Sequence, residues 1–287
     1  MIVITGATGS LGRQIIDRLL TMLPATEIGV SVRDPDRAGD LSDRGVRVRR
    51  GDFADPSSLP SAFEGATQVL VVSANATGEA AVRLNSAAVH AAAAAGAGRV
   101  LYTSHMGADP RSAFPPMRTH AATERVLADC GIPWTSLRNG FYASSAIQQL
   151  RPALQSGELA LPADAAFAWT AHTDLADAAV AVLTGNPIDG ATAALTGSQE
   201  LDMAALAAIA SEVTGHPIRR VVVDDDEFHD RLIARGTPPP IAELALGMFV
   251  ASRRGAFAPA DPTLARLVGH RPVPFRQVLQ DALAAGS

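Results

Sequence analysis

The chain has 287 residues, of which 47 % are hydrophobic and 18 % are charged, so we expect a folded protein with one large domain or a domain and an appended lobe. The net charge of −5 argues against a nucleic-acid-binding surface, and the single cysteine, Cys130, excludes a disulfide within the chain. All 24 basic residues are arginine, and this absence of lysine excludes mechanisms that need one, such as a Schiff base or the phosphate lysine of a P-loop.

The first half of the chain alternates short apolar runs with amphipathic segments, which predicts strands alternating with helices. The predicted strands are, in chain order, Ile2–Thr5, Ile28–Val32, Val46–Arg50, Gln68–Ser73, Arg99–Ser104 and Trp134–Arg138. The predicted helices between them are Leu11–Met22, Ser57–Phe63, Glu79–Ala95 and Pro116–Asp129. This order favours right-handed crossovers and a Rossmann-type α/β fold with a doubly wound, mostly parallel sheet.

After about residue 140 the regular alternation ends, and prolines such as Pro152 and the run 238–240 are expected to break the chain into short elements. We still expect one strand, Ile218–Val223, and four helices: Leu175–Leu183, Asp202–Thr214, Asp226–Arg235 and a last helix containing Gln277–Ala284. Thr173 or Asp174 is expected to cap the first of these helices. We therefore predict an NAD(P)-binding Rossmann domain over residues 1–140 and a smaller α/β substrate-binding lobe over residues 141–287, with some chain returning to the sheet.

A glycine-rich turn joins the first predicted strand to the first predicted helix. Its glycines, Gly6, Gly9 and Gly12, have the spacing that holds the pyrophosphate of a dinucleotide at a helix N-terminus. The residues expected to contact the cofactor there are Gly6, Ala7, Thr8, Gly9, Ser10, Leu11 and Gly12. The alternative is a turn that needs glycine for packing alone.

The end of the second strand decides which nucleotide is bound. An acidic residue there would bind the ribose 2′-hydroxyl, whereas an arginine accommodates a 2′-phosphate. Arg33 follows the strand and favours NADPH over NADH, although Asp34 comes next and Arg33 alone would also suit a solvated surface.

Two further turns lie where the cofactor is expected to pass. Asp52 and Phe53 follow the third strand, and the Asp52 carboxylate is predicted either to accept from the adenine amino group or only to cap the turn. The small residues Ser73, Ala74 and Asn75 end the fourth strand and let backbone approach the ribose closely.

Taken together, six short motifs resemble the short-chain dehydrogenase/reductase superfamily in its atypical NmrA-like branch, and most of all the subgroup of type 2 NAD(P)H:quinone oxidoreductases. The motifs are Thr5–Gly12, Val32–Pro35, Gly51–Phe53, Leu101–Ser104, His120–Glu124 and Leu137–Tyr142. The resemblance covers nearly the whole chain. It implies that the loop from Asn139 to Tyr142 forms a wall beside the nicotinamide, with Asn139 on the cofactor and a quinone-like acceptor above it.

The resemblance also shows a departure from the ordinary serine, tyrosine and lysine triad of the superfamily. Ser104 keeps the position of the serine, but Pro116 stands where the tyrosine would be and His120 where the lysine would be. The triad protonates the strongly basic alkoxide formed when a ketone is reduced. A quinone instead gives a weakly basic hydroquinone anion that takes its proton from solvent, so the missing triad argues against ketone reduction and not against quinone reduction.

Three residues are the candidates for direct contact with the acceptor: Ser104, His120 and Tyr142. Each has an ordinary alternative, in which Ser104 simply ends a strand, His120 forms a structural hydrogen bond on a helix, and Tyr142 belongs to the core. The rings expected to form an apolar wall for the acceptor, or else to pack in the core, are Phe141, Phe167 and Trp169.

We therefore expect an NADPH-dependent oxidoreductase that transfers hydride to a quinone or a similar electrophilic small molecule. The alternatives are a redox sensor that binds NADP(H) and controls a protein partner, and an isomerase or reductase of an unsaturated natural product.

No pair of histidines has the tight spacing of a metal site, so no metal is expected. We see no signal sequence before the first strand and no apolar run of roughly 18 residues, and expect a cytoplasmic protein. The oligomeric state, a homodimer included, stays open.

Overall fold

The chain divides into two compact units in the computed structural model, which describes residues 1–185 and 187–285. Unit 1 consists of Met1–Pro110, Pro116–Asn139 and His172–Leu195. Unit 2 consists of Arg111–Pro115, Gly140–Ala171 and Thr196–Ser287. None of the described helices has the length and hydropathy that crossing a membrane requires. The predicted division into a cofactor-binding and a substrate-binding domain at residue 140 concerns function, and it stays a prediction.

Unit 1 is built on a seven-stranded sheet in the order β10-β6-β5-β4-β1-β2-β3, and neighbouring strands are parallel throughout. The strands are β1 (Ile2–Thr5), β2 (Ile28–Val32), β3 (Arg47–Arg50), β4 (Gln68–Val71), β5 (Arg99–His105), β6 (Trp134–Asn139) and β10 (Gly190–Ala191). This confirms the predicted doubly wound sheet. The strand order reverses between β1 and β4, and ligands of such sheets bind outside the carboxyl ends of strands at this point.

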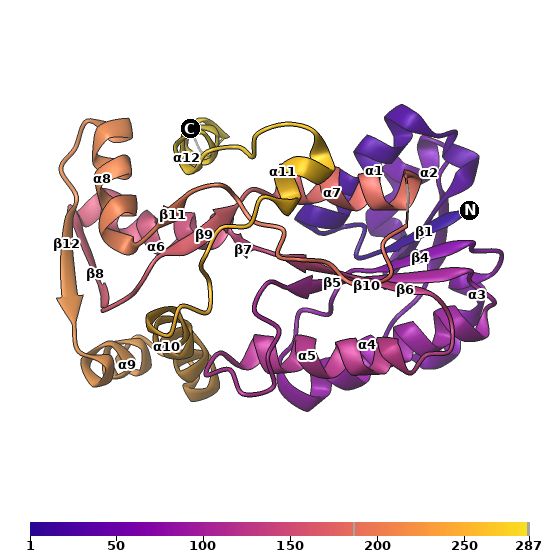
Figure 1. The fold of residues 1–287 in the computed structure, drawn as a ribbon, viewed down its shortest axis with the longest axis horizontal. Coiled ribbons are helices and arrows are strands. Elements are labelled where there is room, and N and C mark those ends of the chain that lie inside the picture. Colours follow the sequence, from indigo (N-terminus) through magenta and orange to yellow (C-terminus); the bar gives the residue numbers. More distant parts are fainter. Residues whose placement is uncertain (186, 286–287) are drawn as a thin grey trace. The chain divides into compact units, whose positions relative to one another are not determined.

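Helices cover both faces of this sheet, as Figure 1 shows. On one face lie α1 (Ser10–Met22), α2 (Gly39–Asp43) and α7 (His172–Thr184), and on the other lie α3 (Leu59–Phe63), α4 (Gly78–Ala94) and α5 (Pro115–Ala128). Three short 3₁₀ helices, Ala25–Glu27, Pro35–Ala38 and Pro56–Ser58, complete the connections. Alternate strand residues point to opposite faces, so Val69, Val71, Val100 and Tyr102 share one core with α3, α4 and α5.

The turn between β1 and α1 depends on glycine at two positions. Gly6 has φ of +64°, a left-handed conformation that L side chains rarely adopt. A Cβ on Gly12 would lie 2.3 Å from the carbonyl oxygen of Gly6, so only glycine lets α1 pack this closely against the turn. Four apolar side chains of α1 at helical spacing are buried and hold the helix on the sheet: Leu11, Ile15, Ile16 and Leu19.

Unit 2 contains two small sheets, one of three strands in the order β11-β9-β7 and one pairing β12 with β8. The strands are β7 (Phe141–Tyr142), β8 (Glu158–Pro162), β9 (Phe167–Thr170), β11 (Glu200–Leu201) and β12 (Arg219–Val223). The helices are α6 (Ala143–Ser156), α8 (Met203–Thr214), α9 (Asp225–Ala234), α10 (Pro239–Arg253), α11 (Thr263–Val268) and α12 (Phe275–Ala285). Its core contains a cluster of buried rings, in which Phe167 stacks on Trp169 and on Phe257 with centroids 4.5 and 4.8 Å apart.

Prolines disrupt this half of the chain less than expected. Pro152 lies inside α6, near its carboxyl-terminal end, and does not break it. Pro239 begins α10, where proline is well tolerated because the first turn of a helix has no carbonyl to pair with its nitrogen. The expected cap of α7 is also wrong: the helix begins at His172, so Thr173 and Asp174 lie in its first turn.

Replacing Gly12 by alanine tests the close approach of α1 to the turn. We expect Gly12→Ala to lower the free energy of unfolding by about 1–3 kcal/mol, because its methyl group forces the helix away from the Gly6 carbonyl. Thermal unfolding followed by circular dichroism measures the effect. Gly39→Ala is the matched control: Gly39 has helical dihedrals, and nothing lies within 4 Å of the place that the new methyl group would take, so this variant should be as stable as the wild type or slightly more stable. Equal loss in both variants would contradict the steric explanation.

Candidate cofactor and acceptor site

The predicted cofactor residues lie at or just beyond the carboxyl ends of strands in unit 1. Gly6–Gly12 follows β1, Arg33 follows β2, Asp52 and Phe53 follow β3, Ser73–Asn75 follows β4, and Asn139 ends β6. Because the strands are parallel, these ends lie along one edge of the sheet. The fold thus brings together residues that are far apart in sequence. Their contacts with a cofactor stay predictions.

The N-terminus of α1 has the form of an anion-binding site. Gly9 is the N-cap residue, and its N–H donates to the Gly6 carbonyl at 3.0 Å, which closes the turn. The N–H groups of Ser10, Leu11 and Gly12 belong to the first turn of the helix, where an α-helix offers them no carbonyl partner. These donors and the helix dipole favour phosphate oxygens, so the turn fits a dinucleotide pyrophosphate.

A cavity of about 220 Å³ opens at the end of β2, and Thr8, Val32, Arg33, Asp34 and Arg37 line it. Within the described residues, no ion pair or side-chain hydrogen bond engages the guanidinium of Arg33 or Arg37. By contrast, most other arginines of unit 1 are paired with carboxylates: Arg13, Arg18, Arg44, Arg49, Arg50, Arg99 and Arg138. Two uncommitted guanidinium groups at one cavity fit a ribose 2′-phosphate.

The carboxylates beside this cavity and beyond β3 both cap local turns. Asp34 Oδ1 accepts from the N–H of Asp36 at 3.2 Å and caps the 3₁₀ helix Pro35–Ala38, so its presence after Arg33 has a structural explanation. Asp52 Oδ1 accepts from the N–H of Ala54 at 2.9 Å, as the turn-capping alternative expects. A contact of Asp52 with adenine stays a prediction.

Core side chains hold the loop after β4, and a buried asparagine ends β6. The N–H of Ser73 donates to Thr103 Oγ1, and the N–H of Ala74 donates to Asn85 Oδ1, both at 2.9 Å. Asn139 is 2 % exposed, and its Oδ1 has no hydrogen-bond partner within the described residues. A buried acceptor at this edge of the sheet fits a polar ligand atom, since leaving it unpaired costs free energy.

Ser104 belongs to a hydrogen-bonded network centred on Glu124 of α5. Glu124 Oε1 accepts from Ser104 Oγ and Ser136 Oγ, each at 2.8 Å, and from Arg138 Nε at 3.0 Å. Arg138 Nη2 donates to the other carboxylate oxygen at 2.6 Å. The network therefore joins α5 to β5 and β6.

The network keeps Glu124 ionised. Burial raises the pKa of Glu124, but hydrogen bonds from Arg138, Ser104 and Ser136 lower it by more, and the net shift is downward. A carboxylate only accepts hydrogen bonds, so the single hydrogen of the Ser104 hydroxyl is directed to Glu124. Ser104 therefore offers lone pairs to a ligand, and its predicted catalytic part stays a prediction.

His120 lies on α5 one turn before Glu124, and Nδ1 of its ring lies 2.8 Å from the hydroxyl of Tyr102. Burial lowers the pKa of His120 from 6.5 to about 4, although the Glu124 carboxylate raises it. His105, at the end of β5, has its ring centroid 6.1 Å from that of His120. Burial and then the neighbouring His120 lower the pKa of His105 to about 3. Both imidazoles are therefore neutral at pH 7.

Tyr142 and the predicted apolar wall belong to unit 2, whereas Ser104 and His120 belong to unit 1. Tyr142 is the second residue of β7 and is partly exposed. Phe141, Phe167 and Trp169 are at most 7 % exposed and pack against one another, as the packing alternative expects. The role of Tyr142 stays a prediction.

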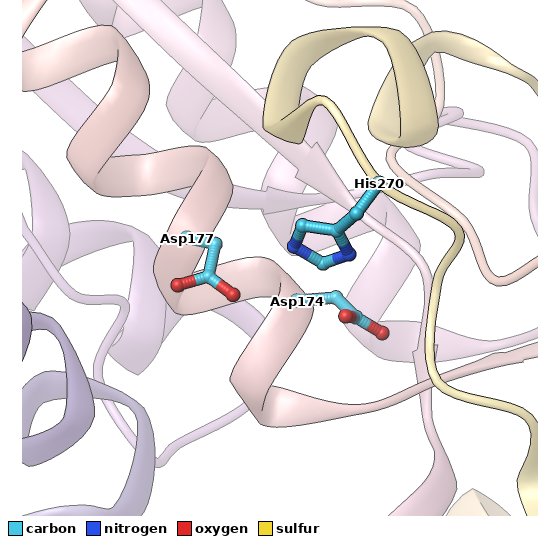
Figure 2. A group of neighbouring side chains, drawn as sticks. All are labelled: Asp174, Asp177 and His270. Atoms are coloured by element: carbon cyan, nitrogen blue, oxygen red, sulfur yellow. The ribbon is translucent and has the colours of Figure 1, made fainter.

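Two carboxylates of α7 lie close together, as Figure 2 shows. Asp174 and Asp177 are one helical turn apart, and Asp177 forms an ion pair with Arg18. His270, also labelled in Figure 2, belongs to unit 2, so we assign no metal site to these residues.

Several residues around this site were not predicted from the sequence. Arg37 lies four positions after Arg33, within the 3₁₀ helix Pro35–Ala38, and both arginines line one cavity. Tyr102 and Ser104 are two positions apart on β5, and His120 and Glu124 are four apart on α5. Those spacings put each pair on one face of its element and are the signal that would have found Tyr102 and Glu124.

The chain is similar in sequence and in fold to several known proteins. A model of the NmrA-like family matches residues 1–267. Quinone oxidoreductase 2 of Escherichia coli (strain K12) is 32 % identical over 271 residues, which cover 94 % of this chain and 94 % of that protein. The crystal structure of an NADPH-dependent quinone oxidoreductase from E. coli complexed with NADPH matches with a TM-score of 0.93 and 30 % identity over 99 % of this chain and 100 % of that chain. The crystal structure of the Citrobacter sp. triphenylmethane reductase complexed with NADP(H) matches with a TM-score of 0.91 and 32 % identity over 98 % of this chain and 100 % of that chain.

The lowered pKa values of His105 and His120 predict a loss of stability in acid. In the unfolded chain the histidines bind protons as the pH falls below 6.5, whereas in the folded chain His120 stays neutral down to about pH 4. Their contribution to stability is therefore complete above pH 6.5 and is lost as the pH falls from 6.5 to about 4, by at most about 1.4 kcal/mol per pH unit for each histidine.

Urea unfolding between pH 4 and pH 7 measures this slope. We expect His120→Gln to make it shallower, because one of the imidazoles with a lowered pKa is gone. His216→Gln, at an exposed position, is the control and should keep the wild-type slope. The same slope in all three proteins would contradict the expectation.

Proposed function

The chain belongs to the NmrA-like family, and from this premise we propose that it is an NADPH-dependent oxidoreductase that reduces a quinone or a similarly electrophilic small molecule. The observation that carries the proposal is the pair of uncommitted guanidinium groups, Arg33 and Arg37, beside the glycine turn of β1 and α1. Together they fit two features of NADPH: the pyrophosphate, which NADH also has, and the ribose 2′-phosphate, which distinguishes NADPH from NADH.

In this proposal, separate segments of unit 1 bind different groups of the cofactor. The first turn of α1 binds the pyrophosphate through its N–H groups, and Arg33 and Arg37 bind the 2′-phosphate. Ser73, Ala74 and Asn139 line the path toward the nicotinamide, where Asn139 Oδ1 is a buried acceptor. The bound cofactor supplies the hydride, which carries two electrons to the acceptor.

The acceptor is a molecule whose reduced form needs no strong acid. The chain has no lysine, Pro116 replaces the usual tyrosine, and the hydroxyl hydrogen of Ser104 is directed to Glu124. His120 is neutral and, with its pKa near 4, is a hydrogen-bond donor at pH 7 rather than a proton donor. Such a site suits a quinone, because the hydroquinone anion that forms takes its proton from solvent.

The relatives favour an enzyme over a redox sensor. The E. coli relative is a quinone oxidoreductase, and the Citrobacter relative is a reductase of triphenylmethane dyes. Quinones and cationic dyes are both electron-poor conjugated molecules, which accept a hydride readily. We extend this class of acceptor to the present chain. A cytoplasmic location and a homodimer stay predictions.

Turnover of the purified protein tests the proposal. We expect oxidation of NADPH, followed at its near-ultraviolet absorbance, to exceed the uncatalysed rate with simple benzoquinones and with a triphenylmethane dye. Acetophenone is the control acceptor: it is a ketone whose alkoxide needs an acid, and it should not be reduced. Binding of NADPH and NADP⁺ with different affinities, without turnover of any acceptor, would favour the sensor instead.

Arginine variants test the choice of nucleotide. We expect Arg33→Ala and Arg37→Ala each to raise the KM for NADPH by roughly 10- to 100-fold, which corresponds to the loss of one charged hydrogen bond of about 1.5–3 kcal/mol. The KM for NADH should stay nearly constant, since it lacks the 2′-phosphate. Arg235→Ala, at an exposed position of unit 2, is the control and should change neither value. An equal rise for both nucleotides would contradict the assignment of the cavity.

A further inference from the structure

A buried asparagine beneath the candidate site has its side-chain orientation fixed by the backbone. Asn85 of α4 is 1 % exposed, and its Oδ1 accepts from the N–H of Ala74 at 2.9 Å. A backbone N–H only donates, so this contact identifies the oxygen of the amide. The other end of the amide, Nδ2, must then donate, and it lies 3.1 Å from Tyr102 Oη and 3.4 Å from Thr123 Oγ1.

The direction of this bond determines what the tyrosine does. Tyr102 is fully buried, and its hydroxyl lies between Asn85 Nδ2 and His120 Nδ1, the latter at 2.8 Å. The phenolic oxygen accepts from Asn85, and its one hydrogen is then available to Nδ1 of a neutral imidazole, which offers a lone pair. In the opposite arrangement two N–H groups would converge on the same oxygen.

We propose that Tyr102 is a positioning residue that holds His120 in the tautomer with its hydrogen on Nε2, so that His120 offers a neutral N–H donor to the acceptor. The expected effect on turnover rests on the proposed function, whereas the expected tautomer of His120 does not. Asn85 and Tyr102 thereby form a chain of donors that runs in one direction, from the loop after β4 to the imidazole of α5.

The chemical consequence follows from where charge develops. NADPH loses a hydride and becomes NADP⁺, while the quinone gains that hydride and then one proton from solvent to become the hydroquinone. During hydride transfer the acceptor oxygen becomes negative, and an N–H donor stabilises it whereas a ring lone pair would repel it. His120 keeps its hydrogen throughout, so Tyr102 only sets which ring nitrogen carries it.

Ring ¹⁵N NMR of the labelled full-length protein measures the tautomer directly. The chain has seven histidines, and the signals that vanish in His120→Gln assign this ring. We expect protonated Nε2 and unprotonated Nδ1 at pH 7 in the wild type, and in Tyr102→Phe a mixture of both tautomers. A wild-type ring with its hydrogen on Nδ1 would overturn the inference, and this measurement needs no turnover.

Kinetics supply the second readout. We expect Tyr102→Phe to lower kcat with benzoquinone by roughly three- to tenfold, as the loss of one hydrogen bond predicts, and to leave the KM for NADPH within about twofold. Thr123→Val is the matched control: it removes another polar partner of Asn85 in the same core, and within the described residues Thr123 forms no hydrogen bond with His120, so kcat and the tautomer should stay as in the wild type. Unchanged kcat in Tyr102→Phe, in a protein that turns over quinones, would refute the positioning role and leave the proposed function intact.

Discussion

Helix α5 is joined to the sheet of unit 1 through one largely buried carboxylate. Glu124 accepts hydrogen bonds from Ser104 on β5 and from Ser136 and Arg138 on β6. An ion pair of this kind gives little net stability, but loss of one partner destabilises the fold because the other charge is left uncompensated. His120 lies one turn away on the same helix, so the network that anchors α5 also fixes the imidazole relative to the ends of the strands.

The polar side chains on this face of β5 have little freedom to act as acids. Ser104 directs its hydrogen to Glu124, and by our inference Tyr102 directs its hydrogen to His120. Because both hydroxyl hydrogens are bound within the protein, neither hydroxyl can protonate a reduced acceptor. The proton that the reduced acceptor needs must then come from solvent. This is a coherent arrangement for an acceptor that needs electrons first, and a poor one for a simple ketone.

Unit 1 was predicted well from the sequence because most of its strands are buried on both faces and alternate with helices. The predicted strands Ile2–Thr5 and Ile28–Val32 agree with β1 and β2 residue for residue. Unit 2 was predicted less well, since α10 begins with prolines in its first turn and α6 continues through Pro152 although proline removes one helical hydrogen bond there. Rules based on the local sequence treat each proline as a helix breaker and do not include the tertiary packing that stabilises such a helix.

The site shows the same limit. Residues within a contiguous motif, such as the glycine turn, were identified because their chemistry depends on neighbours in the sequence. The contact of Asn85 with Tyr102 joins α4 to β5 across 17 positions, and Glu124 meets Arg138 across 14. Such contacts form because the crossovers between strands bring distant segments together, and no local sequence pattern predicts them.

The exclusive use of arginine has a consequence for how the cofactor site responds to its surroundings. A guanidinium stays charged at any pH at which a protein remains folded, whereas an amine in the same place would titrate in mildly alkaline solution. The two cations at the end of β2, Arg33 and Arg37, therefore form a fixed electrostatic background. If Arg33 and Arg37 bind the 2′-phosphate as we propose, any dependence of nucleotide binding on alkaline pH originates elsewhere in the complex.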